Sequence, residues 1–304
     1  MKFAVGAIFK NEDAYVLEWL AFHKVVGFSR FLIADNGSTD LTRQILSTLE
    51  KHEPITVVDY QDEPDVRPQL GAYNLLTKMC PSDVDAIAFI DADEFIAPMG
   101  GASSVVPKLT ELFSDADVGG LALNWACFGS AGHRFWEDGL VIERFLKRSL
   151  NKFSVNQHYK AVVRPGYVDH WTTPHHATLK RGRYINALGQ ELDFREGRKD
   201  SLSKTVVWDH LRVNHYVVKS FEEFVLRKSP KGSASKAGRV KHKKYFELHD
   251  KNNEVCDAML TLVPAVKAEI ARLEALIAPV VDSVDPEPTW RQWLHNLKSG
   301  LKRG

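Results

Sequence analysis

The segment AFIDADEF, residues 88–95, places two carboxylates one residue apart directly after an apolar run. The run 86–90 has the length and composition of a buried strand. Side chains at positions i and i+2 of an extended chain lie on one face, so we expect Asp91 and Asp93 to reach one cation. Carboxylate oxygens suit Mn²⁺ or Mg²⁺, which complete their coordination with phosphate oxygens. Two capping acids in a turn are the structural alternative for a bare DxD motif.

The sequence around this motif alternates between short apolar runs and helical patterns. Strands are predicted at 3–9, 30–34, 55–60, 86–90 and 119–125, with helices from about residue 12, after 38 and from 68. Gly27 is placed to end the first helix, Ser38 to cap the second, and Pro68 to begin the third. Strand–helix alternation predicts βαβ units and therefore an α/β fold with a mostly parallel sheet.

Polar residues follow four of these predicted strands in succession. They include Glu12 after the first strand, Asp35 and Asn36 after the second, Arg67 after the third, and Asp91 with Asp93 after the fourth. In an open α/β sheet, ligands bind just beyond the carboxyl ends of the strands. The sequence therefore predicts one binding crevice lined by these residues.

The second half of the chain is less regular. A strand is predicted at 206–216, followed by a basic stretch with eight Lys or Arg residues between Arg227 and Lys244. Helices are predicted at 253–262 and 264–277, and an amphipathic basic helix at 289–301. We expect a main domain over residues 1–250 and a helical C-terminal extension over 251–304. The last helix is a candidate for peripheral membrane contact, although packing on its own protein is the commoner use of such a helix.

The bulk composition bounds the class of protein. The 304 residues carry a net charge of +1, which argues against a general nucleic-acid-binding protein. Three scattered cysteines give neither a disulfide framework nor a zinc-binding pattern. The N-terminal apolar run is shorter than a signal peptide requires, and the sequence has no stretch long enough for a membrane span. The expected location is cytoplasmic, with membrane association left open; the oligomeric state is not predicted.

Three ordered blocks of the sequence resemble a known group of enzymes. They are KNEDAYVLEWLAFHKVVGFSRFLIADNGSTD at 10–40, AFIDADEF at 88–95 and NHYVVKSFEEFVLRKSPKG at 214–232. Together they look like bacterial glycosyltransferases related to families 2 and 92. The resemblance implies the GT-A fold, a nucleotide-diphosphate-sugar donor and a Mn²⁺ or Mg²⁺ cofactor.

The resemblance also implies roles for individual residues. Asp91 and Asp93 match the DxD motif that holds the metal on the donor diphosphate, and His215 matches a late histidine that serves as a third metal ligand. Asp35 matches a position near the nucleotide base, and Glu12 lines the same pocket. Lys219 and Arg227 are placed to meet the diphosphate. The basic stretch that follows is suited to closing over a bound diphosphate, although a solvated face is an equally good interpretation of any one lysine.

An inverting transfer needs a carboxylate that takes the proton of the acceptor hydroxyl. In HRFWEDGLVIERF, residues 133–145, an acidic pair precedes an arginine in the way that family 2 resemblance suggests. Asp138 is the first candidate for this base and Glu143 the competitor. Either residue is also an ordinary acid near a helix N-terminus.

These observations predict a metal-dependent glycosyltransferase. The expected reaction moves a hexose, galactose by resemblance to family 92, from a UDP-sugar to a glycan acceptor in surface polysaccharide synthesis. Two alternatives remain at this point. A phosphatase of the haloacid dehalogenase type also has a DxD motif after a strand, but lacks the Glu94–Phe95 continuation and the three preceding strands. A non-catalytic nucleotide-sugar-binding protein would keep the same site without transfer.

Overall fold

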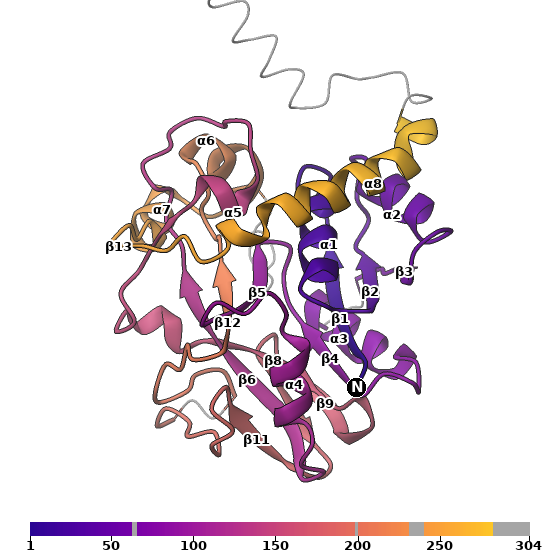
Figure 1. Ribbon diagram of the computed structural model, residues 1–304, viewed down its shortest axis with the longest axis vertical. Helices are drawn as coiled ribbons and strands as arrows, with labels where there is room; N and C mark the ends of the chain where they lie inside the picture. Colours follow the sequence, from indigo (N-terminus) through magenta and orange to yellow (C-terminus); the bar gives the residue numbers. More distant parts are fainter. Residues whose placement is uncertain (63–65, 198–199, 231–239, 282–304) are drawn as a thin grey trace, which may run out of the picture.

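The computed structural model describes residues 1–62, 66–197, 200–230 and 240–281. Over these residues the chain forms an α/β structure around one large sheet (Figure 1). Its strand order is β3-β2-β1-β4-β8-β6-β12-β5, with β11 paired to β6. The strands of this sheet are β1 (Phe3–Phe9), β2 (Arg30–Asp35), β3 (Ile55–Asp59), β4 (Ala86–Phe89), β5 (Glu94–Pro98), β6 (Val118–Cys127), β8 (Tyr159–Val163), β11 (Arg183–Asn186) and β12 (Leu211–His215).

The first half of the sheet is parallel, as the sequence predicts. β1 pairs in parallel with both β2 and β4, and β2 pairs in parallel with β3. Antiparallel pairs enter where β8 joins β4 to β6 and where β12 joins β5. The expected mostly parallel α/β architecture is confirmed, and the position of the DxD motif after β4 agrees with the GT-A fold that the resemblance implied. Two small sheets pair β9 (Val168–Thr173) with β10 (His176–Leu179), and β7 (Lys147–Arg148) with β13 (Glu254–Val255).

The helices cover both faces of the sheet. They are α1 (Val16–Val25), α2 (Thr42–Leu49), α3 (Pro68–Met79), α4 (Val106–Leu112), α5 (Val141–Arg144), α6 (Phe221–Glu223), α7 (Lys243–His249) and α8 (Val263–Val281). Because successive side chains of a strand point to opposite faces, β1 serves two cores. Phe3, Val5 and Phe9 pack in the core that contains α1, α2 and α8, whereas Ala4 packs in the core that contains α3.

Several predicted element boundaries are close to the structure, and three expectations are wrong. Pro68 begins α3, and Gly27 has a φ of +111° just after α1. Ser38 does not cap α2, whose N-cap is Leu41; the Ser38 hydroxyl instead accepts a hydrogen bond from the backbone N–H of Asn11. The spacing of apolar residues after Pro68 predicts that Met79 faces inward, but this residue is exposed. The predicted helix at 253–262 is replaced by β13 and a short 3₁₀ turn, because the backbone there pairs with β7.

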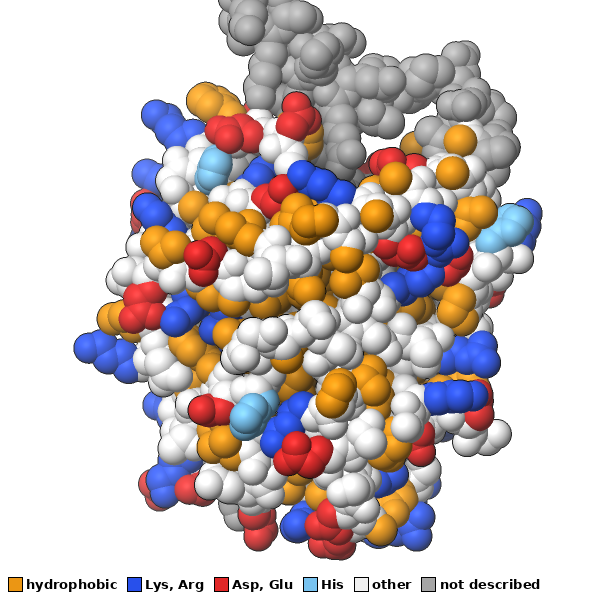
Figure 2. Space-filling model, in the orientation of Figure 1, with side chains coloured by type: hydrophobic (Ala, Val, Ile, Leu, Met, Phe, Trp, Pro, Cys, Tyr) orange, Lys and Arg blue, Asp and Glu red, His pale blue; other side chains and the backbone are white. Residues whose placement is uncertain are grey.

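The helical C-terminal region lies against the main body rather than apart from it. In Figure 1, α8 crosses α1 and α2, and Val266, Leu273 and Ile277 belong to the same buried cluster as β1. The division at residue 250 stays a prediction, and the predicted helix at 289–301 lies outside the described residues. None of the helices described here is long and apolar enough to cross a membrane. On the face shown in Figure 2, the coloured acidic and basic side chains are interspersed, in keeping with the net charge of +1.

Candidate active site

A cavity of about 790 Å³ opens at the carboxyl ends of β1, β2 and β4. One wall consists of the residues that follow these strands. The opposite wall follows β12 and includes a π-helical turn, Phe224–Lys228. Polar and charged side chains predominate in the lining at Lys10, Asn11, Glu12, Asn36, Asp40, Asp62, Gln69, Asp91, Asp93, Lys219, Glu223, Arg227, Lys228 and Lys241. The position is the ligand crevice expected of an α/β sheet, and its volume is that of a site for a small organic ligand.

The DxD motif lies in a turn between β4 and β5, not in an extended strand. The backbone N–H of Glu94 donates to the carbonyl of Asp91 over 3.1 Å, and the indole N–H of Trp19 reaches the carbonyls of both residues over 3.1 Å. The expectation that Asp91 and Asp93 share one face of a strand is therefore wrong. Through its pairing with β6 and that of β6 with β8, β12 runs in the same direction as β4. Because β5 runs antiparallel to β12, the chain reverses between β4 and β5.

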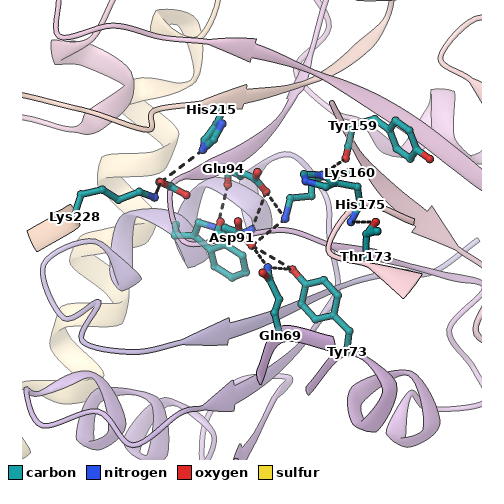
Figure 3. A network of polar contacts seen from close by, with 12 residues as sticks. Gln69, Tyr73, Asp91, Glu94, Tyr159, Lys160, Thr173, His175, His215 and Lys228 are labelled. Carbon is teal, nitrogen blue, oxygen red and sulfur yellow. Dashed lines mark hydrogen bonds and ion pairs between the residues drawn. The ribbon is translucent and has the colours of Figure 1, made fainter. Parts of the chain in front are cut away.

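Asp91 faces a buried lysine. Its Oδ1 accepts from Lys160 Nζ over 2.9 Å, from Gln69 Nε2 over 2.5 Å and from the Tyr73 hydroxyl over 3.2 Å (Figure 3). Lys160, on β8, is 1% exposed and also lies 3.3 Å from Glu94 Oε2. Burial lowers the pKa of Lys160, but Asp91 and Glu94 together hold this pKa well above its usual value. Asp91 is thus already neutralised by a fixed internal cation.

Asp93 has different partners from those of Asp91. Its Oδ2 lies 3.7 Å from His215 Nε2 and accepts from the Lys228 ammonium. Burial raises the pKa of Asp93, but Lys228 and His215 outweigh it and hold this pKa well below its usual value. Burial lowers the pKa of His215. The site therefore presents an ionised carboxylate beside a neutral imidazole.

This donor pair suits a divalent cation. Metal binding needs a deprotonated carboxylate and a neutral imidazole nitrogen, and the lowered pKa values of Asp93 and His215 both favour these forms. The Lys228 ammonium stands where a cation would meet Asp93. Within the described part of the chain, no group of three or more His, Cys, Asp or Glu side chains is placed to hold a metal. The three predicted ligands are thus not brought together, because Asp91 is turned towards Lys160 while Asp93 and His215 lie side by side.

The predicted nucleotide-binding residues divide into two groups. Glu12 and Asn36 line the cavity, and Asn36 Nδ2 donates to Asp62 Oδ1 over 2.7 Å. Asp35 is buried at the end of β2 and is not among the lining residues; its Oδ2 accepts from the Ser38 N–H, while its Oδ1 has no partner within the described residues. Arg67 is the N-cap residue of α3; it is exposed and lies outside the lining.

Lys219 and Arg227 both line the cavity, in the wall opposite the strand ends. The Lys219 ammonium lies 4.1 Å from the centre of the Tyr15 ring, and burial lowers its pKa. Arg227 pairs with Asp13 and lies 3.6 Å from Asp40, so its charge is shared with two acids. Residues 231–239 of the predicted basic stretch lie outside the described residues.

The two candidate bases are not at the cavity. Asp138 is exposed on the loop before α5. Glu143 caps α5, where its Oε2 accepts from the backbone N–H of Leu140, and its Oε1 binds Lys267 of α8. Neither residue belongs to the cavity lining. The arginine of the same motif, Arg144, instead forms a buried ion pair with Glu223.

Sequence reasoning missed four side chains that contact the carboxylates of the DxD turn. Gln69 and Tyr73 share one face of α3, four residues apart, which is a helical signal that marks them as neighbours. Lys228 follows the predicted Arg227 directly. Lys160 carries no sequence signal, because a lysine inside an apolar strand is recognised as an ion-pair partner only when the strand order is known.

Comparison with known proteins identifies the family. The family model described as glycosyltransferase family 92 matches residues 2–256. The chain belongs to glycosyltransferase family 92. Membership in this family removes the haloacid dehalogenase alternative.

Curated relatives of this family 92 chain occur in plants. A glycosyltransferase family 92 protein of Oryza sativa subsp. japonica is 24% identical over 189 residues, which cover 61% of this chain and 31% of that protein. A family 92 protein of Ricinus communis is 25% identical over 191 residues, with 58% and 31% covered. The matched part is thus about a third of the length of these relatives. Family 92 is confirmed, whereas the expected bacterial group finds no support in these plant relatives.

Solved structures also show partial similarity to the chain. Residues 1–349 of S. aureus TarS match with a TM-score of 0.37 at 16% identity, covering 55% of this chain and 48% of that one. Glucosyl-3-phosphoglycerate synthase of Mycobacterium tuberculosis, in complex with Mn²⁺, UDP and glucosyl-3-phosphoglycerate, matches with a TM-score of 0.31 at 15% identity, covering 55% and 58%.

Proposed function

We propose that this family 92 chain transfers a hexose from a UDP-sugar to a glycan acceptor, with a divalent cation held by Asp93 and His215. The observation that carries the proposal is the 3.7 Å distance between His215 Nε2 and Oδ2 of Asp93, a carboxylate that lines a cavity formed by strand ends; His215 itself lies behind Asp93, outside the lining. The cation would be Mn²⁺ or Mg²⁺, because its other ligands are the hard oxygens of a diphosphate. When bound, it would supply charge stabilisation to the departing nucleoside diphosphate.

The residues of the chain have separate tasks in this proposal. Glu12 and Asn36 line the end of the cavity nearest β1 and β2, where the nucleoside would lie. Asp35 is buried outside the cavity lining, so its place near the nucleotide base stays a prediction from the resemblance. Lys219 and Arg227 place positive charge on the opposite wall, beside the proposed diphosphate position.

Asp91 takes a supporting role instead of the direct metal contact that the motif suggests. Its Oδ1 is held by Lys160, Gln69 and Tyr73. These hydrogen bonds would fix the turn that carries Asp93, in the way that hydrogen bonds to the residues around a metal site orient its ligands. Exchange of Asp91 should therefore weaken metal binding through the position of Asp93.

The stereochemical outcome and the acceptor are separate parts of the proposal. An inverting transfer remains a prediction from the resemblance, and it requires a base at the cavity, where neither Asp138 nor Glu143 lies. UDP-galactose is the first donor to test, and a surface polysaccharide the first class of acceptor.

Calorimetric titration with UDP, with and without Mn²⁺, tests the donor site. We expect metal-dependent UDP binding by the wild type, its loss in Asp93→Ala and His215→Ala, and a smaller loss in Asp91→Asn. Asp193→Asn is the control, because this acid is exposed, pairs with Lys204 and lies outside the cavity lining. Failure of the wild type to bind UDP with metal would reject the proposal.

Donor consumption separates an enzyme from a non-catalytic binding protein. The wild type that binds UDP should release UDP from a UDP-hexose in the presence of a suitable glycan, and Asp93→Ala should not. UDP binding without turnover across a panel of donors and acceptors would favour the non-catalytic alternative.

A further inference from the structure

Each carboxylate of the DxD turn has a lysine partner, but the two lysines differ in how firmly they are held. Lys160 is 1% exposed and contacts Asp91 and Glu94 from the interior of a strand. Lys228 is 28% exposed and contacts Asp93 from the cavity wall. The charge of Lys160 is therefore a fixed part of the fold, whereas that of Lys228 is open to exchange.

The element that carries Lys228 supports this distinction. Phe224–Lys228 forms a single π-helical turn, in which the Ser229 N–H bonds to the carbonyl of Phe224 over 2.8 Å. Such turns widen a helix at the expense of regular hydrogen bonding and occur often at functional sites. Lys228 is the last residue of the turn, and its flexible four-carbon stem carries a compact point charge.

Lys228 contacts the same carboxylate oxygen that faces the imidazole of His215. Asp93 Oδ2 accepts from Lys228 and lies 3.7 Å from His215 Nε2. A divalent cation bound by Asp93 and His215 would have to occupy this position. Two cations on one buried oxygen repel strongly in a medium of low dielectric constant. Metal binding and the Lys228–Asp93 contact therefore exclude each other.

The diphosphate of the donor is a suitable new partner for the displaced Lys228 ammonium. Lys228 lines the cavity together with Arg227 and Lys219. The diphosphate of the donor gains negative charge as the sugar–phosphate bond breaks, so the leaving nucleoside diphosphate carries more negative charge than one divalent cation neutralises. The free ammonium is thus placed to bind a phosphate oxygen, where it would stabilise the leaving group.

We propose that Lys228 is an exchangeable counter-ion of the donor site, which neutralises Asp93 in the free protein and transfers to the diphosphate when the metal and the donor bind. This inference rests on the proposed function and adds a residue that acts on the leaving group. It predicts that loss of Lys228 has opposite effects on the two ligands.

Mn²⁺ binding to the free protein gives the first half of the test. Free Mn²⁺ is measured by electron paramagnetic resonance in titrations of the wild type, Lys228→Met and Lys228→Arg without nucleotide. Lys228→Met should bind Mn²⁺ roughly tenfold more tightly than the wild type, the factor expected for the loss of one charged hydrogen bond that competes with the metal. Lys228→Arg keeps the competing charge and should stay closer to the wild type.

UDP binding at saturating Mn²⁺ gives the second half. Lys228→Met should bind UDP roughly tenfold more weakly than the wild type, because the diphosphate loses one cationic partner. Lys10→Met is the matched control, since Lys10 also lines the cavity but lies on the strand-end wall. It removes the same charge from the same cavity and should not tighten Mn²⁺ binding.

The outcomes distinguish this inference from the proposed function. Unchanged or weaker Mn²⁺ binding by a folded Lys228→Met variant, with a wild type that binds Mn²⁺ and UDP, overturns the exchange and leaves the proposed function standing. A wild type that binds UDP equally well with and without Mn²⁺ overturns the metal-dependent function, and the exchange with it.

Discussion

Arg144 and Glu223 form a two-point ion pair inside the protein, with Nη1 to Oε2 and Nη2 to Oε1 both at 2.9 Å. Both side chains are buried, and Glu223 also accepts from the Tyr15 hydroxyl over 2.8 Å. The pair joins α5, which follows the loop with Asp138, to Glu223 in the wall of the cavity. Its role is therefore to hold the position of the segment that carries Lys219 and Lys228.

Breaking this pair from one side should destabilise the fold strongly. Arg144→Met leaves the Glu223 carboxylate buried without its cation, which costs about 3–5 kcal/mol in comparable buried pairs. Urea unfolding measures the loss. Arg144→Met combined with Glu223→Gln should recover part of it, because no unpaired charge remains. Arg183→Met removes a partly exposed arginine from Asp115 and should cost under about 1 kcal/mol. Equal losses for Arg144→Met and Arg183→Met would contradict the buried pair.

Gly71 should resist replacement by alanine although it lies within a helix. A Cβ atom at this position would lie 1.9 Å from the Tyr60 hydroxyl. Helix propensity alone favours alanine by about 1 kcal/mol, but overpacking of this kind costs roughly 1–3 kcal/mol. We expect Gly71→Ala to lower the free energy of unfolding, measured by urea denaturation. Tyr60→Phe in the same chain should reduce that penalty; if the two changes are simply additive, the steric explanation is wrong.

Glu18 should make the protein less stable as the pH rises. Burial raises the pKa of its carboxyl to about 7, although the N–H groups of Val141 and Ile142 bond to it. Because the folded-state pKa exceeds the unfolded value of 4.5, the protonated form stabilises the fold. That contribution is complete below pH 4.5 and is lost as the pH rises through 7.

Glu18→Gln removes this titration and provides the measurement. The free energy of unfolding of the wild type should fall relative to that of the variant between pH 5 and pH 8, by up to about 3 kcal/mol. Urea unfolding at the two pH values gives the difference. Parallel pH profiles for the two proteins would mean that this carboxyl is already ionised at pH 5.

The packing of α8 should contribute to the stability of the main body. Leu273 is fully buried in the core cluster that contains β1 and α1. Leu273→Ala should cost about 2–5 kcal/mol in the single unfolding transition, as buried leucine truncations do. Leu248→Ala, at an exposed position of α7, is the control and should change stability by about 0.5 kcal/mol or less. An unchanged main transition in Leu273→Ala would support a separate extension after residue 250.

Local patterns in the sequence predicted the first half of the fold well. Strand β1 was predicted at its observed bounds, and Pro68 marks the start of α3, because apolar runs and helix-start residues act over a few neighbouring positions. The region 253–262 was misassigned, since its strand pairing with β7 depends on residues more than a hundred positions away. Short-range propensity does not decide between a helix and such a pairing.

By itself the sequence determined the family, through three ordered blocks of residues that resemble it. The order of apolar runs along the chain determined the α/β class and the meeting of polar strand ends at one crevice. Only the tertiary structure decided which cation each acid of the DxD motif meets. Asp91 receives Lys160 from β8, whereas Asp93 receives His215 from the end of β12 and Lys228 from the π-helical turn that follows. The reason is physical: electrostatic partnership depends on distance in space, and the turn between β4 and β5 sends two neighbouring carboxylates in different directions.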